Sequence, residues 1–135
     1  MPVSPEQIGV VTRTWDRAGQ EPDRLHAAVA RRLPGPAAGE RARWVVDAVG
    51  RLSSALDRPT ALPPAAAAVI ARRAPVTLAE LAVDRDACLG ALRSLTADFG
   101  PAEEEAWDAA FQLFQELVGP LCLDPFGTRE KRSTP

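Results

Sequence analysis

Residues 101–118 constrain the fold more than any other stretch, because they carry a single apolar stripe along one long helix. Pro101 follows Gly100 at a first helical position, where the missing N–H of proline costs nothing. Glu103, Glu104 and Glu105 occupy the first turn, where the helix dipole favours negative charge. The apolar residues recur every three or four positions: Trp107, Ala110, Phe111, Phe114, Leu117 and Val118. An aromatic stripe of this kind has to be buried, so we expect this helix at the centre of the core.

A second long helix is predicted directly before the first. Thr77 and Glu80 have the spacing of a capping box, in which each side chain bonds to the backbone of the other residue. The apolar positions again recur at helical spacing: Leu78, Leu81, Cys88, Leu92 and Leu95. Phe99 closes the connection to the helix at 101–118. We therefore expect an antiparallel pair of helices, with Leu92 and Leu95 largely buried.

Proline and glycine divide the rest of the chain into four shorter helical segments. We expect these helices at 4–19, 22–33, 40–56 and 62–74, each with an apolar face of helical period. The alternation of a half-buried strand appears nowhere in the sequence. The pattern predicts an all-α bundle of about six helices over residues 1–119. Residues 120–135 turn polar and charged after Phe126, so we expect a flexible C-terminal tail there.

Composition excludes several classes of function. The chain has 135 residues and a net charge of −2, which gives no electrostatic basis for nucleic-acid binding. The N-terminus lacks a signal-peptide pattern, and the longest apolar run, 62–71, contains two prolines and is too short for a membrane span. Cys88 and Cys122 have neither metal-ligand nor disulfide spacing. We expect a reduced cytoplasmic protein, with Cys88 a small buried hydrophobic residue and Cys122 open to exposure near the tail.

Residues 91–114, ALRSLTADFGPAEEEAWDAAFQLF, resemble the last two helices of bacterial single-domain globins and flavohaemoglobin globin domains. The resemblance extends over roughly residues 8–119. Trp15 takes the place of the usual tryptophan of the first helix, residues 48–62 look like the long distal helix and its turn, and residues 62–76 look like the proximal helix. It implies a globin fold, and in its ordinary form a haem cofactor that binds oxygen or NO.

The haem-binding residues of that family do not carry over to this chain. The proximal histidine would fall on Ala71 or Arg73, and an arginine has no lone pair to give to iron. The tyrosine that faces the bound gas would fall on Ala30, and the phenylalanine of the second corner is missing from a corner compressed to 34–39. The resemblance is therefore to a degenerate globin, and we expect no cofactor.

Few other residues are candidates for chemistry. His26, the only histidine, lies beside an apolar stripe and is expected at a helix boundary or surface; it is an iron ligand only if haem is bound. The arginine pairs at 41/43 and 72/73 are expected on solvated faces, with one sharper alternative, that Arg72 or Arg73 grips an anion. The sequence offers no nucleophile–base pair and no metal-ligand cluster, so we expect no enzyme activity and no metal.

Three functions remain open. The first is a haem-free globin-like regulatory or sensor module with an apolar ligand, and the second is a haem-binding globin for oxygen or NO with an unusual ligand. The third is a helical interaction module that binds another protein, and the sequence leaves the oligomeric state open.

Two predictions are open for the space where the resemblance puts the haem. In the first, the third helix packs directly onto the fourth, and the space is filled by Val45, Val49, Val69 and Ile70. In the second, the same residues line a pocket. In the second case Arg72 or Arg73 stands at the mouth of the pocket and binds an anionic head group. We expect collapse, because alanines 65–68 allow the two helices to approach closely, and with it a regulatory or partner-binding role.

Overall fold

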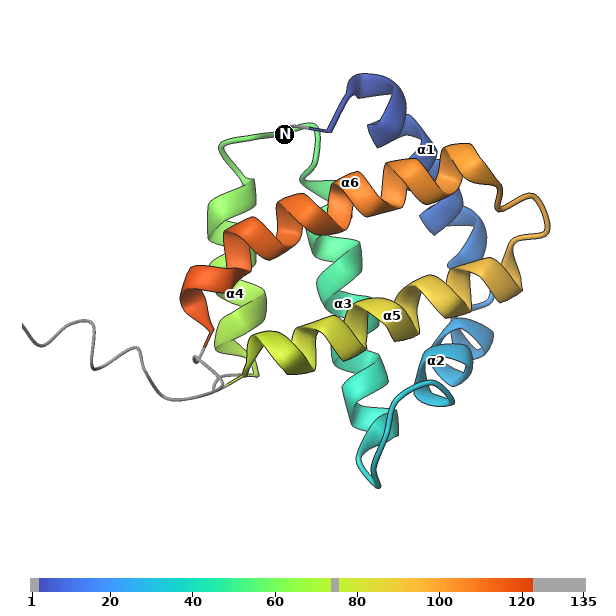
Figure 1. Cartoon of the computed structure of the whole chain (residues 1–135), viewed down its shortest axis with the longest axis vertical. Coiled ribbons are helices and arrows are strands. Elements are labelled where there is room, and N and C mark those ends of the chain that lie inside the picture. Colours follow the sequence, from blue (N-terminus) through green and yellow to red (C-terminus); the bar gives the residue numbers. More distant parts are fainter. Residues whose placement is uncertain (1–2, 74–75, 123–135) are drawn as a thin grey trace, which may run out of the picture.

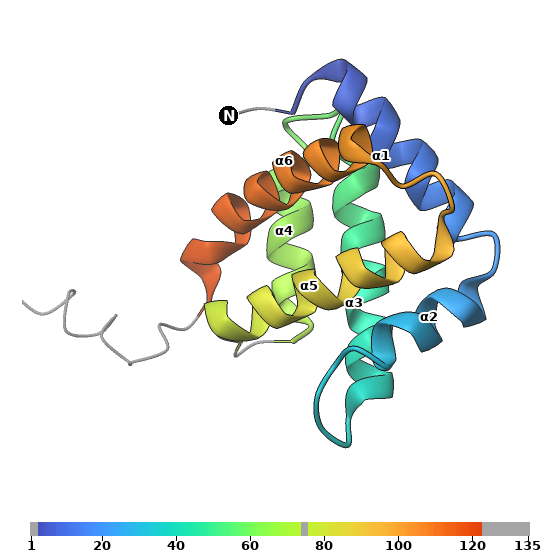
Figure 2. The same cartoon turned by 45° about the vertical axis from the view of Figure 1, so that its right-hand side comes forward.

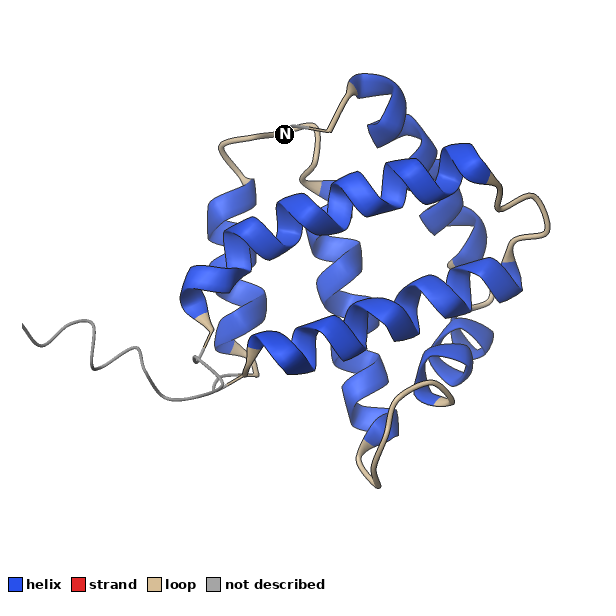
Figure 3. Ribbon diagram, viewed as in Figure 1, coloured by secondary structure: helices blue, strands red, loops and turns tan. Residues whose placement is uncertain are grey.

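The computed structural model describes residues 3–73 and 76–122. Within these ranges the chain forms six α-helices and one short 3₁₀ turn, with no strand (Figure 1; Figure 3). The elements are α1 (Pro5–Ala18), α2 (Pro22–Ala30), α3 (Ala38–Ser54), α4 (Leu62–Ala71), α5 (Leu78–Leu95), α6 (Pro101–Val118) and η1 (Gly119–Leu121). The predicted all-α fold is confirmed. Most of the predicted tail, residues 123–135, lies outside the described residues.

Local signals set the starts of the helices. The Thr77 hydroxyl accepts a hydrogen bond from the Glu80 N–H at 3.1 Å, and the Glu80 carboxylate accepts one from the Thr77 N–H at 3.0 Å. Ser4 and Gln7 make the same reciprocal bonds at the start of α1. Helix ends are less well set by sequence: α2 ends at Ala30 and α4 at Ala71, each about three residues earlier than expected.

Figures 1 and 2 show α5 and α6 running in opposite directions across the same side of α3. Each of the two has its main partners elsewhere: α5 packs on α2, while α6 packs on α1 and α4. An ion pair between Arg93 and Glu104 links α5 to α6 directly. The packing of these two helices on each other as a hairpin stays a prediction.

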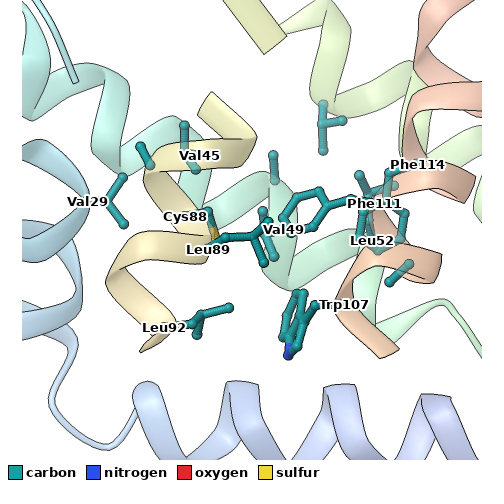
Figure 4. Packing of buried hydrophobic residues seen from close by; sticks show 14 of the residues in the cluster. Val29, Val45, Val49, Leu52, Cys88, Leu89, Leu92, Trp107, Phe111 and Phe114 are labelled. Carbon is teal, nitrogen blue, oxygen red and sulfur yellow. The ribbon is translucent and has the colours of Figure 1, made fainter. Parts of the chain in front are cut away.

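The aromatic stripe of α6 lies in the interior. Trp107 is fully buried, and its ring lies 5.9 Å from that of Trp15 and 5.7 Å from that of Phe111, measured between centroids. Phe111 in turn meets Phe114 edge to face at 5.8 Å. Leu92 is fully buried, whereas Leu95 is only partly buried. Figure 4 shows side chains from α2, α3, α5 and α6 pointing into one shared interior.

The Trp107 indole N–H is buried without a hydrogen-bond partner among the described residues. A buried donor of this kind lowers stability, so packing rather than hydrogen bonding has to hold the ring in place. The contacts with Trp15 and Phe111 supply that packing. The stripe of α6 is thus the centre of the core.

Replacing Trp107 with alanine should lower the free energy of unfolding by about 3–5 kcal/mol, because a large buried ring is lost and a cavity remains. Urea unfolding followed by circular dichroism measures this change. Leu121→Ala is the control, since Leu121 is 46% exposed and its loss should cost under about 0.5 kcal/mol. A cost below about 1 kcal/mol for Trp107→Ala would show that the core is centred elsewhere.

Both cysteines of the chain are buried. Cys88 lies in the apolar face of α5, as expected, and burial raises the pKa of its thiol from the ordinary value of 9.0 to about 12, with Asp84 adding to the effect. Cys122 is 3% exposed, and its Sγ lies 3.2 Å from the carbonyl oxygen of Val118. The sequence left open that Cys122 is exposed; its side chain, directly after η1, is instead buried.

The Cys88 thiol makes the stability of the protein fall at alkaline pH. The unfolded thiol ionises near pH 9, while the folded one holds its proton until about pH 12. The contribution of the buried neutral thiol to the free energy of unfolding is therefore complete below pH 9. It is lost at about 1.4 kcal/mol per pH unit as the pH rises towards 12. Urea titrations at pH 8–11 should show a steeper fall in the free energy of unfolding for the wild type than for Cys88→Ala, by up to about 1.4 kcal/mol per pH unit. The comparison of the two proteins removes the contribution of every other group that they share. Equal slopes in the two proteins would contradict the burial of the thiol.

Candidate functional site

A buried carboxylate ties three helices together at one end of the core. The Asp84 side chain, on α5, is only 5% exposed. Its Oδ1 accepts a hydrogen bond at 2.8 Å from Arg41 of α3, and its Oδ2 accepts one from Arg73, which lies two residues beyond the end of α4. A buried carboxylate needs such partners, because its desolvation costs several kcal/mol.

Two further side chains complete this cluster. The Arg73 guanidinium lies over the Trp44 ring, 4.7 Å from its centroid, and the Trp44 indole N–H donates to the Val69 carbonyl oxygen at 3.0 Å. Glu80 approaches Arg73 to 3.7 Å. The hydrogen bond from the Thr77 backbone, helped by the Thr77 hydroxyl and by the charge of Arg73, holds the pKa of Glu80 below its ordinary value. We call Arg41, Trp44, Arg73, Glu80 and Asp84 the Asp84 cluster.

The Asp84 cluster corrects the prediction that both arginine pairs are solvated. Arg43 and Arg72 are exposed as expected, but the Arg41 and Arg73 side chains are only 21% and 14% exposed. One signal in the sequence pointed to this arrangement. Asp84 falls on the inward face of α5, three residues after Leu81 and four before Cys88, where an acidic residue requires a buried cation.

A pocket of about 70 Å³ lies beside the cluster, between α3, α4, α5 and α6. Its wall is almost entirely apolar, and Asp84 is one of the few charged residues that border it. The residues around the pocket are Trp44, Val45, Ala48, Val49, Leu52, Val69, Ile70, Leu81, Ala82, Asp84, Arg85, Phe111, Phe114, Gln115 and Val118. Ala82 and Arg85 of α5 are partly exposed and Gln115 of α6 is exposed, so these two helices border the mouth.

The four aliphatic residues proposed from sequence all border this pocket: Val45, Val49, Val69 and Ile70. The two arginines do not. Arg73 belongs to the Asp84 cluster, and Arg72 donates to Asp47 at 3.1 Å on the surface. Neither arginine therefore stands at the mouth, where sequence reasoning placed one of them. With buried aliphatic residues and a small residual space, the helices are close to the collapsed arrangement.

The other residues considered for haem lie outside the pocket. Ala71 is exposed at the end of α4, and Ala30 is partly buried at the end of α2. The His26 ring is partly exposed on α2, and its Nδ1 lies 2.7 Å from the Pro22 carbonyl oxygen. His26 is thus a boundary residue, in the position expected for it.

A second, polar hollow of about 50 Å³ lies where α1 meets the α5–α6 connection. It is bordered by Val10, Arg13, Thr14, Arg17, Thr96, Asp98 and Glu103. Arg17 donates to Asp98 at 2.5 Å, and this hydrogen bond holds the pKa of Asp98 below its ordinary value. Both side chains are more than half exposed, so the pair contributes little to stability. The Thr14 hydroxyl donates to the Val10 carbonyl oxygen within α1, and the Thr96 hydroxyl, directly after α5, donates to the Leu92 carbonyl oxygen.

Some kinds of site have no counterpart in residues 3–73 and 76–122. No group of three or more histidine, cysteine or acidic side chains there is arranged to hold a metal ion. None of the helices in the same ranges has both the length and the apolar character that a membrane crossing requires.

Comparison of the chain with protein-family models, with curated proteins and with solved structures finds no match. The apolar pocket and the adjoining Asp84 cluster are therefore interpreted from their own geometry. Together they place an apolar pocket beside a charged cluster in which Asp84 is paired with Arg41 and Arg73, while the Arg41 Nε is buried without a hydrogen-bond partner among the described residues.

Replacing Asp84 with asparagine should lower the free energy of unfolding by about 3–5 kcal/mol, because two largely buried guanidinium groups lose their counter-charge. The chain offers a matched control. Asp47 also sits between two arginines, Arg51 at 2.9 Å and Arg72 at 3.1 Å, but its side chain is 39% exposed. Asp47→Asn should cost under about 1 kcal/mol. Equal losses in the two variants, measured by urea unfolding, would show that the cluster is not specially buried.

Proposed function

We propose that this chain is a haem-free, globin-like module with a regulatory rather than a catalytic role. The observation that carries the proposal is the set of contacts that the Arg73 side chain makes. This residue is one of the two positions, with Ala71, where the resemblance puts the proximal histidine, and its guanidinium is bound by Asp84 and lies over the Trp44 ring. An arginine cannot ligate iron, and the Arg73 guanidinium is held within the fold by these two side chains.

The size and chemistry of the pocket support the same proposal. Its volume of about 70 Å³ is far below the range of about 300–1,000 Å³ that is usual for cofactor and ligand sites. None of the residues around it is a histidine, cysteine, methionine or tyrosine, so the space offers no protein ligand for haem iron. The residues present do not fit a haem group.

A further support for the proposal is the order of the helices along the chain. α3 resembles the distal helix and α4 the proximal helix, and both border the pocket, with α5 and α6 along its other sides. The globin fold likewise packs its helices pairwise around a central ligand pocket. The order of the segments along the chain is the one that the resemblance implies.

A catalytic role has little support among the described residues. Asp84 is the one buried acid among the residues that border the pocket, and both of its carboxylate oxygens already accept hydrogen bonds from arginines. Arg85 and Gln115, at the mouth, give no nucleophile–base pair. A module of this kind acts through what it binds, either a small apolar ligand or another protein.

Haemin added to the purified protein should give no saturable shift of the Soret band, because neither Ala71 nor Arg73 can bind iron. The absorption titration is run in parallel on His26→Ala, which should behave as the wild type does. A sharp one-to-one band that disappears in His26→Ala would instead make this a haem-binding globin with His26 as its ligand.

A further inference from the structure

We propose that the pocket between α3, α4, α5 and α6 binds an uncharged hydrocarbon group of about three or four carbon atoms. The inference rests on the proposed function, for which it names the class of ligand. It starts from the near absence of polar atoms in the pocket wall. A space lined in this way offers water few hydrogen-bond partners, and apolar cavities in proteins bind small apolar molecules.

The volume sets the size of the group. An apolar protein cavity of about 150 Å³ holds a six-carbon ring. The space of about 70 Å³ is roughly half as large, so it holds about half that ligand. A larger molecule can still bind if only its end enters, because the pocket is open between Ala82 and Arg85 of α5 and Gln115 of α6.

The charged side chains that border the pocket are already paired, and this favours a neutral ligand. Asp84, at the wall, is already bound by Arg41 and Arg73, so it has little capacity left for a ligand cation. Arg85, at the mouth, bonds to its neighbour Asp86 at 3.2 Å. An anionic ligand would have to compete for a paired arginine while it gave up its own hydration. Gln115 remains at the mouth as an uncharged polar group, suited to an alcohol or similar neutral head.

A group bound in the pocket would contact all four helices that border it. Val49 of α3, Ile70 of α4 and Phe114 of α6 border the same space as Leu81 of α5. Because α5 and α6 each pack mainly on other helices, a group between them bridges two parts of the core. Binding should therefore stabilise the protein and change the signals of residues on all four helices.

The test uses the full chain with methyl-labelled valine and isoleucine, followed by NMR. The probes are cyclopropane, a whole small hydrocarbon, 1-octanol, a neutral chain of which one end enters, and octanoate, its anionic counterpart. The methyl signals of Val45, Val49, Val69 and Ile70 should shift in a saturable way with at least one neutral probe. The dissociation constant should be on the order of 1 mM, the affinity expected for so few atoms. Octanoate should bind at least about tenfold more weakly than 1-octanol.

Variants that fill the space separate specific binding from surface adsorption. Ala48→Leu, within the wall, and Ala82→Leu, near the mouth, should each weaken binding at least about tenfold. Ala67→Leu is the control, because Ala67 is exposed on α4 and does not border the pocket. Its binding should match the wild type. If Ala48→Leu fails to fold, Ala82→Leu decides the question, since that site is only partly buried.

The outcomes are distinct. Binding of cyclopropane alone supports a whole small molecule as the ligand, and tighter binding of 1-octanol supports the end of a longer chain. The inference is overturned if neither neutral probe gives saturable shifts, if octanoate binds most tightly, or if Ala82→Leu binds as the wild type does. Saturable haemin binding by a protein that still binds the neutral probe would overturn the proposed function instead.

Discussion

The burial of Asp84 is the constraint on which the arrangement of α3, α4 and α5 depends. A carboxylate that is 5% exposed needs cations beside it, and they are supplied by Arg41 of α3 and by Arg73, just beyond the end of α4. Trp44 covers Arg73 and bonds to the backbone of α4 through Val69. The end of α4 is therefore held against α3 and α5 at one point, while small and branched side chains fill the space between the helices.

The Asp84 cluster lies beside a small space. Arg73 is directed towards Asp84 and Glu80 and does not border that space. Val45 and Val49 of α3 and Val69 and Ile70 of α4 are all buried around the remaining pocket. Protein interiors pack densely, so a space between helices has to be filled by a ligand or closed by side chains. Here side chains close most of the space, and a small apolar pocket is left.

Sequence reasoning worked best where the determinants are local. The capping boxes at Ser4 and Thr77 and the stripe of α6 depend on residues three or four positions apart, and the structure contains all of them. The burial of Cys88 followed from its place in a stripe. The burial of Cys122 did not, because it depends on how η1 turns after α6, a feature with no periodic signal.

The sequence by itself determined the helices, their order and the apolar stripes that face inward, since these follow from helical period, caps and breakers. Only the tertiary structure decided the partners of the charges and the volume of the pocket. Arg41 and Asp84 are 43 positions apart, so nothing local records that they meet. The pocket likewise depends on how closely four helices approach, and a shift of about one methyl group in their packing decides whether such a space stays open.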